Sequence, residues 1–330
     1  MTDLDFLKEI TSLYSGSGSE NELVCFLEKE FSSLGFNTQK DNLGSLIVKN
    51  FSEGKCDILL DAHIDQIGFV ITEVLEGGFL RMAPVGGVDE RVAASQPVIV
   101  RGKKDYIGVI SSVPPHLSDD KKLSKCEDLF IDLGLSESAE ISVGDRAYFY
   151  APINVFPSGR IFGGALDDKL AVLTLYKTAK LLGKTDKKVA FLFSSREEVG
   201  GQGALTGAFS VSPKYSVAVD VSFGFMPGNE KRECGILGKG PMIGFSPILS
   251  EDFSRLAVEV AKKVGIPYQI EVVGGRTGTN ADSLSISGRG SKALTVSFPI
   301  FNMHTPVESA DLIDIDNTAE LLSALIEEVK

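Results

Sequence analysis

The sequence is poor in the features that mark several large classes of protein. It has four cysteines in 330 residues, Cys25, Cys56, Cys126 and Cys234, and none forms a Cys-x-x-Cys pair. Neither a disulfide framework nor a thiolate zinc site is therefore indicated. No apolar run approaches the roughly 20 residues that cross a bilayer, so we expect no membrane partner. The acidic N-terminus, residues 1–5, lacks a signal-peptide pattern, and we expect a soluble cytoplasmic protein.

Positive charge is also scarce. The chain carries 33 lysine and arginine residues against 45 acidic residues, a net charge of −12. Because no basic cluster offers a footprint for phosphates, a nucleic-acid partner is not expected. Apolar residues make up 43% of the chain, enough for a sizeable core. The length leaves room for roughly two domains.

Apolar strand-like runs and amphipathic helical patterns occupy both ends of the chain. Strands are predicted at 36–39, 45–49, 56–62, 187–193, 216–221, 268–272 and 293–298, and helices at 3–14, 19–34, 170–182, 255–264 and 317–329. Ser19-x-x-Glu22 has the form of a capping box for the second helix. A glycine-rich loop is expected at 224–245. These patterns predict an α/β fold.

A different pattern separates those two parts. Short alternating segments at 69–74, 79–82, 97–100, 106–110 and 146–149 are divided by glycine, proline and charged turns. This spacing predicts a small β-barrel or sandwich inserted into the main domain. The polar stretch 116–125 is interpreted as a mobile loop, and His116 as a structural or loop residue.

Acidic residues follow two of the predicted buried strands. Glu197 and Glu198 stand where the strand 187–193 ends, at the place where open α/β folds put their ligands. Adjacent carboxylates repel each other unless a cation lies between them or one is protonated. His63-x-Asp65 ends another strand, and the carboxylate can hold the imidazole in position. Either pattern alone is more often structural than catalytic.

Further candidates extend this set. Asp167 and Asp168 precede the helix 170–182, Asp220 lies where a strand emerges, and His304 follows the last buried strand. Two imidazoles and several carboxylates on one sheet edge suit a pair of divalent ions bridged by a carboxylate, with zinc, cobalt or manganese fitting the mixed donors. A glutamate beside a ligand glutamate supplies a general base. The glycine-rich turn 274–283 does not fit nucleotide-loop spacing, so no nucleotide is expected.

Five ordered motifs carry a resemblance to a known family. They are His63-Ile64-Asp65-Gln66-Ile67-Gly68, Ala165-Leu166-Asp167-Asp168-Lys169, Arg196-Glu197-Glu198-Val199-Gly200, Val219-Asp220-Val221 and Met303-His304-Thr305-Pro306-Val307-Glu308. In this order they resemble the M42 metallo-aminopeptidases, which include glutamyl and tetrahedral aminopeptidases and some members with an endoglucanase label. The resemblance runs over essentially the whole chain.

The resemblance implies two divalent metal ions per subunit, with zinc or cobalt favoured. One ion would be held by His63, Asp167 and Asp220, and the other by Asp167, Glu198 and His304. Asp167 would bridge them. Glu197 would be the general base for a metal-activated water that releases N-terminal residues from peptides, and Asp65 would orient His63.

The resemblance also implies an architecture. Residues 1–65 and 157–330 would form an α/β catalytic domain with a central mixed sheet flanked by helices. Residues 66–156 would form an inserted β-rich dimerisation domain. Peptides would be the substrates, and the chain would form homo-oligomers, from dimers up to hollow dodecamers.

Two positions depart from the family pattern, and other functions remain open. Many members have a glutamate where this chain has Gln66, and an aspartate where it has Asn280. These changes motivate one alternative, a catalytically altered paralogue without enzymatic activity. A metal-dependent amidase or deacylase is another. A glycosidase with paired carboxylates would not need His63 and His304.

Overall fold

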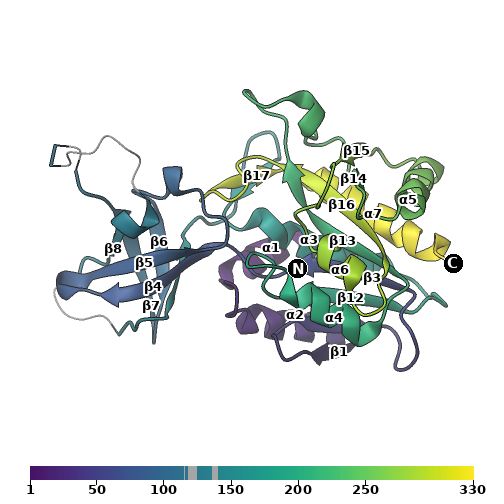
Figure 1. Cartoon of the computed structure of the whole chain (residues 1–330), viewed down its shortest axis with the longest axis horizontal. Helices are drawn as coiled ribbons and strands as arrows, with labels where there is room; N and C mark the ends of the chain where they lie inside the picture. Colours follow the sequence, from purple (N-terminus) through teal and green to yellow (C-terminus); the bar gives the residue numbers. More distant parts are fainter. Residues whose placement is uncertain (115, 118–124, 136–139) are drawn as a thin grey trace.

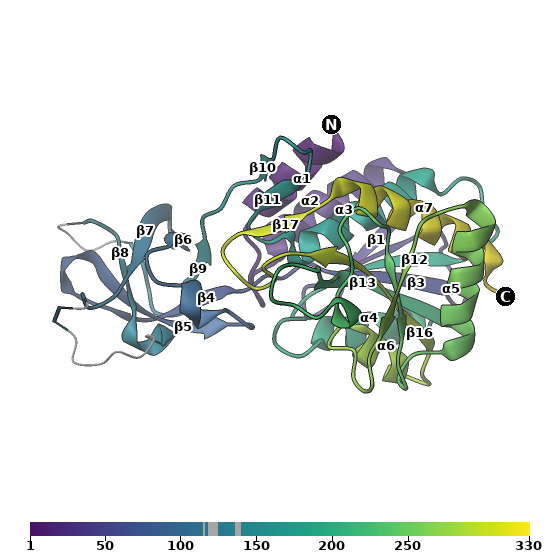
Figure 2. The same cartoon turned by 90° about the horizontal axis from the view of Figure 1, so that it is seen from above.

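The computed structural model runs from Met1 to Lys330 and describes every residue except 115, 118–124 and 136–139. Two lobes lie next to each other (Figure 1): a β-barrel, in blue, and a larger lobe in which helices surround a sheet. Both chain termini belong to the larger lobe. The turned view in Figure 2 shows the same separation of the lobes. The predicted α/β fold with an additional small barrel is confirmed.

The larger lobe is built on an eight-stranded mixed sheet. In spatial order its strands are β1 (Asn37–Lys40), β2 (Leu46–Lys49), β12 (Val189–Ser194), β3 (Ile58–His63), β13 (Tyr215–Phe223), β16 (Lys292–Ile300), β14 (Met242–Phe245) and β15 (Gln269–Val272). The four central strands run parallel, and β2 and β14 are antiparallel to them. Every residue of β3 and β12 is buried, which explains why both strands are mostly apolar, with Asp61 and His63 as the charged residues of β3.

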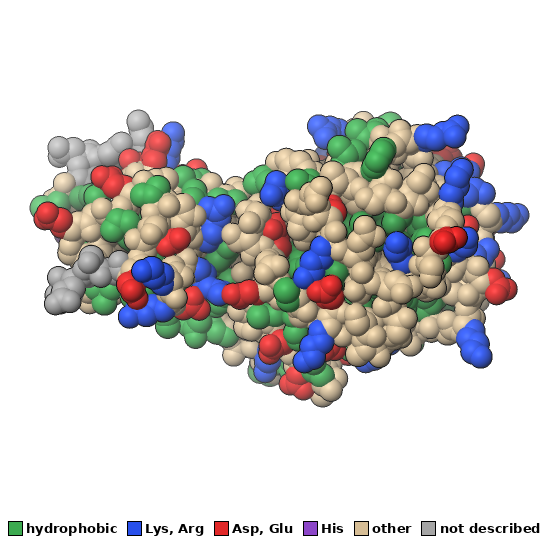
Figure 3. Space-filling model, turned by 90° about the horizontal axis from the view of Figure 1, so that it is seen from below, with side chains coloured by type: hydrophobic (Ala, Val, Ile, Leu, Met, Phe, Trp, Pro, Cys, Tyr) green, Lys and Arg blue, Asp and Glu red, His purple; other side chains and the backbone are tan. Residues whose placement is uncertain are grey.

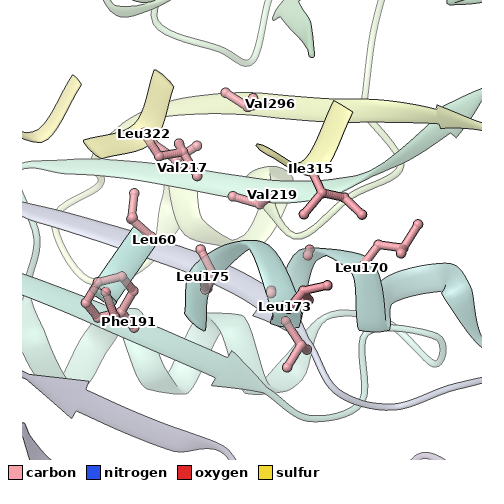
Figure 4. Packing of buried hydrophobic residues seen from close by; sticks show 14 of the residues in the cluster. Leu60, Leu170, Leu173, Leu175, Phe191, Val217, Val219, Val296, Ile315 and Leu322 are labelled. Atoms are coloured by element: carbon pink, nitrogen blue, oxygen red, sulfur yellow. The ribbon is translucent and has the colours of Figure 1, made fainter. Parts of the chain in front are cut away.

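Helices cover both faces of this sheet. They are α1 (Asp3–Ser12), α2 (Asn21–Ser33), α3 (Leu166–Leu181), α4 (Gln202–Val211), α5 (Glu251–Val264), α6 (Ala281–Ile286) and α7 (Leu312–Glu328). The larger core lies between the sheet and the α1, α2, α3, α5 and α7 side, while α4 and α6 pack on the other face. Figure 4 shows the larger core, where Leu173 of α3 and Leu322 of α7 lie among side chains of the central strands.

The barrel closes on itself and has its own core. Its strands, in order around the barrel, are β4 (Gly68–Val74), β5 (Phe79–Val85), β8 (Phe130–Asp132), β7 (Asp105–Ser111), β6 (Pro97–Arg101) and β9 (Arg146–Phe149). Phe69, Val98, Ile110 and Ile131 belong to one buried cluster inside it. Strand β8 was not predicted, because three residues are too few for a period to show. Of the stretch 116–125, residues 118–124 lie outside the described residues.

Several predicted boundaries were wrong. Helix α2 begins after Glu20, which forms no side-chain cap, so the Ser19 capping box does not exist; the Glu20 carboxylate instead accepts from the Gly18 amide. Helix α3 starts four residues before 170, and α7 starts five residues before 317. The predicted loop 224–245 ends in strand β14, and α4 was not predicted at all.

A small third sheet lies beside α3 and β16. It contains β10 (Asn154–Val155), β11 (Ile161–Gly163) and β17 (Glu308–Ala310). Within the described part of the chain, no helix combines the length and apolar character needed to span a membrane.

Candidate metal centre

The predicted site residues meet at the edge where the parallel strands end. His63 is the last residue of β3, Glu197 and Glu198 follow β12, and Asp167 opens α3. His304 follows β16 and has a left-handed backbone, with φ at 60°. Asp220 was expected where its strand ends, but it lies inside β13, which continues three residues further along β16.

Two clusters of potential ligands form there. His63, Asp167 and Asp220 offer ligand atoms that all lie within 4.8 Å of one another, and so do Asp167, Glu198 and His304. Asp167 belongs to both clusters, and its two oxygens point in different directions. The His63 Nε2 lies 3.1 Å from its Oδ1, and the His304 Nε2 lies 3.2 Å from its Oδ2. This is the arrangement expected of a carboxylate shared by two cations.

Both histidines are held in the tautomer that a ligand needs. The Nδ1 of His63 lies 3.0 Å from the backbone carbonyl of Asp65, and the Nδ1 of His304 lies 3.1 Å from that of Gly87. Since a carbonyl only accepts, each Nδ1 carries a proton, and each Nε2 is the ring nitrogen that faces Asp167 and that a cation would bind. Gly87 belongs to the loop after barrel strand β5, so the barrel lobe contributes to positioning His304.

The carboxylates lie in a place that disfavours their charge. Burial, together with Asp167, raises the pKa of Glu198 to about 8, and burial raises the pKa of Asp220 well above its usual value. Burial also opposes ionisation of Asp167, but hydrogen bonds with His304 and His63 outweigh it and hold its pKa low. A hydrogen bond to Asp167 raises the pKa of His304 to about 9.

These protonation states and the donor types fit divalent cations. A cation in each cluster would stabilise the crowded carboxylates and replace the protons on the histidines. Imidazole nitrogens with carboxylate oxygens suit zinc and similar ions, and no cysteine takes part in either cluster of described residues. His116 is exposed in the barrel lobe and belongs to neither cluster.

Asp65 fixes the turn that carries the two glutamates. Its carboxylate accepts from the amides of Glu197 (2.9 Å) and Glu198 (3.2 Å), and from the Ser17 hydroxyl (2.6 Å). The expected contact to His63 is made mainly by the Asp65 backbone carbonyl, because the nearer carboxylate oxygen is 3.6 Å from Nδ1. Asp65 thus connects one predicted ligand to the predicted base.

Two buried charged residues had not been predicted to support the site. Glu308 accepts from the amides of Asp167 and His304, both at 3.0 Å, and so joins the start of α3 to the His304 loop. Lys169 is fully buried, and its ammonium donates to Ser15 Oγ and to the Ile64 carbonyl near Asp65. Both residues stand inside the quoted motifs, but no periodicity indicated where their side chains lie.

The two departures from the family pattern lie beside the clusters and not in them. Asn280 donates to Asp61 (2.9 Å) and to Ser194 (2.8 Å), linking buried side chains of β3 and β12. The Gln66 amide donates to the Ser15 carbonyl, and the side-chain oxygen of Gln66 accepts from the Ser15 amide. Both side chains are buried and hydrogen-bonded, so both have structural partners in this chain.

A cavity of about 290 Å³ opens onto the clusters. His63, Asp167, Glu197, Asp220 and His304 line it, together with further residues of β13, β14, β15 and β16. Glu197 therefore faces the same space as four predicted ligands, His304 included. Burial raises the pKa of Glu197, which places a proton acceptor of increased basicity beside them.

Comparisons with known proteins identify the family that this chain is similar to. The model of the M42 glutamyl aminopeptidase family matches residues 44–321. The lysyl aminopeptidase of Pyrococcus furiosus is 30% identical over 344 residues, covering 100% of this chain and 98% of the relative.

Solved structures show the same fold. An aminopeptidase from the archaeon Desulfurococcus kamchatkensis has a TM-score of 0.93 at 34% identity, covering 99% of this chain and 94% of that one. The TET1 peptidase of Pyrococcus horikoshii has a TM-score of 0.87 at 34% identity, covering 99% and 100%. Because the family model matches residues 44–321 and a relative is 30% identical over the full length of the chain, this chain belongs to the M42 family of metal-dependent aminopeptidases.

Proposed function

We propose that this aminopeptidase holds two divalent cations per subunit and releases the N-terminal residue of peptides with Glu197 as general base. The observation that carries the proposal is the orientation of Asp167, whose two oxygens face two different histidines. His63 and Asp220 would complete one ion site, and Glu198 and His304 the other. Zinc or cobalt suits these donors.

The bound ions would supply Lewis-acid activation of a water and of the scissile carbonyl. The protein supplies the proton transfers. Glu197 Oε accepts the proton of the attacking water and later donates it to the nitrogen of the leaving peptide, so it ends the cycle unprotonated. The hydrogen bonds from the Glu197 and Glu198 amides to Asp65 keep the base and the ligand in a fixed relation.

We also propose that the barrel, within residues 66–156, is the dimerisation domain. Apolar side chains on β7 are exposed, with Ile107 at 61% and Val109 at 44%. In Figure 3 apolar side chains lie among charges of both signs on the barrel. The Pyrococcus horikoshii TET1 peptidase assembles into a tetrahedron or a large octahedral shell, and a similar homo-oligomer, from dimer to dodecamer, is expected of this chain.

The test is a panel of aminoacyl-anilides and short peptides, assayed on the purified protein before chelation, after chelation, and after zinc, cobalt or manganese is restored. N-terminal residues should be released only with metal, and acetylated peptides should resist cleavage. Metal content should reach two ions per subunit. Cleavage of acetylated substrates would favour the deacylase alternative. Metal binding without turnover on the whole panel would favour a non-enzymatic paralogue.

A further inference from the structure

Besides Glu197, one acidic side chain that belongs to neither ligand cluster also lines the cavity. Glu271 of β15 lines the cavity together with Ser222 of β13 and Ser297 of β16. The Ser222 hydroxyl donates to Glu271 Oε1, so the glutamate side chain reaches from the edge strand of the sheet across to β13. Glu271 has no role in the proposed metal centre.

The position of this carboxylate relative to the metal ligands can be read along β13. Ser222 follows Asp220 by two residues, so both side chains lie on one face of the strand, roughly 7 Å apart. A fully extended lysine side chain spans about 6 Å from Cα to Nζ, given C–C bonds of about 1.5 Å. A substrate with its α-amine near the clusters would therefore bring a lysine ammonium close to Glu271.

The apolar side chains of the cavity suit the aliphatic part of a lysine side chain. Phe223, Phe245, Leu249 and Val273 all line the cavity. Within the described chain, no lysine or arginine lines it, so an acidic substrate side chain would find no positive partner there. Apolar walls together with the Glu271 carboxylate match the amphipathic character of lysine.

We propose that this cavity selects peptides with an N-terminal lysine, and that Glu271 is the specificity-determining residue that receives the ε-ammonium. The inference rests on the proposed function, because it assumes that the N-terminal residue enters this cavity. Family membership leaves the choice open: the matching family model is described as glutamyl, and the Pyrococcus furiosus relative as lysyl.

The electrostatics of the site support this assignment. Burial raises the pKa of Glu271, while the hydroxyls of Ser222 and Ser297 lower it in part. Glu271 is half-buried, and a partly desolvated carboxylate with hydroxyl partners lacks a positive charge that an ammonium would supply. An N-terminal glutamate would bring a second carboxylate against it, and a leucine would leave it unpaired.

The first experiment compares kcat/KM on lysyl, arginyl, leucyl and glutamyl anilides for the wild type and E271Q. The wild type should favour lysine over leucine by at least tenfold. E271Q should lose at least tenfold on lysine while leucine changes by less than threefold. E259Q is the control, because it removes one exposed negative charge from α5, and it should behave as the wild type. A wild type that is fastest on glutamate, or an unchanged lysine-to-leucine ratio in E271Q, would overturn the proposal.

A binding measurement separates this inference from the proposed function. L-norleucine has the stem of lysine without the ammonium, so calorimetry should show L-lysine binding at least tenfold more tightly in the wild type and equally in E271Q. If that difference appears but no substrate is turned over with metal bound, the proposed function fails and the lysine site stands. If turnover occurs but neither binding nor kcat/KM depends on Glu271, the lysine site is wrong and the proposed function stands.

Discussion

The two lobes of this protein bury different kinds of side chain. The sheet lobe buries Asp61, His63, Asp167, Lys169 and Asp220. In the described part of the barrel lobe, by contrast, the fully buried side chains are hydrophobic. Removing an ion from water costs on the order of several kcal/mol even where it is paired, so the sheet lobe bears a cost that the barrel does not. The buried charged side chains are thus concentrated in the lobe that holds the proposed metal centre.

The barrel contributes to the site through the loop that follows β5. The loop after β5 offers the Gly87 carbonyl to His304, and the Asp89 amide donates to the His304 carbonyl. Substitutions in the two lobes should therefore have different consequences. Four experiments test this contrast.

The largest effect is expected from D167N. The amide replaces one of the two oxygens that face His63 and His304, so the shared ligand is lost. Metal content should fall below two ions per subunit, and kcat/KM should fall at least about a thousandfold. The matched control is D105N in the barrel, where Asp105 pairs with Arg101 at the surface; it should keep both metals and activity. Two retained metals in D167N would contradict the bridging role.

The next largest effect is expected from E197Q. Glutamine cannot accept the proton, so kcat should fall by about 10² to 10⁴, while metal analysis should still find two ions per subunit. The adjacent E198Q is the matched comparison, since it should lose metal as well as activity. A fully active E197Q would show that another group is the base.

The third effect is on stability. N280D would put a second carboxyl against Asp61, whose pKa burial raises to about 7. Asp61 therefore keeps its proton up to a higher pH in the folded state than in the unfolded chain. Because the folded state binds more protons, the free energy of unfolding falls as the pH rises from about 4 through 7. N280D should therefore cost about 1–3 kcal/mol at pH 8 and less at pH 5, measured by urea unfolding. Equal stability of both proteins at pH 8 would contradict this account.

The smallest chemical effect is expected in the barrel. Serine at both Ile107 and Val109 removes exposed apolar surface without touching the barrel core, so each subunit should keep its fold. Sedimentation velocity should show a smaller assembly than the wild type, and kcat/KM should change less than about threefold. An unchanged assembly would mean that β7 is not the interface.

Elements with a long apolar run or a clear amphipathic pattern of hydrophobic residues were predicted well, and elements without such a pattern were not. The apolar runs of β3 and β12 and the amphipathic pattern of α5 were all recognised. Helix α4 was missed because its sequence, Gln202-Gly-Ala-Leu-Thr-Gly-Ala-Phe-Ser-Val211, is rich in small residues and has low helical propensity. Its Gly207 must be small, since a Cβ there would lie 2.5 Å from Leu192 of β12.

The residues of the site also differ in how well the sequence alone could place them. The candidate metal ligands could be predicted because all of them except Asp220 stand at or just beyond a strand end or at a helix start, and parallel strands end at one edge. Glu308 and Lys169 could not be placed, because each side chain has a partner more than 100 residues away in the chain: Asp167 for Glu308, and Ser15 and Ile64 for Lys169. Glu271 was predicted only as part of a strand, and nothing local showed that it reaches Ser222.

The sequence by itself determined the kinds of donor available and the order in which they occur. The tertiary structure decided which atoms meet. Asp167 faces two histidines only because β3 and the His304 loop converge on the start of α3. Glu271 enters the cavity only because its side chain crosses from the edge strand β15 to β13. Such contacts depend on strand order and register, which local residue patterns do not encode.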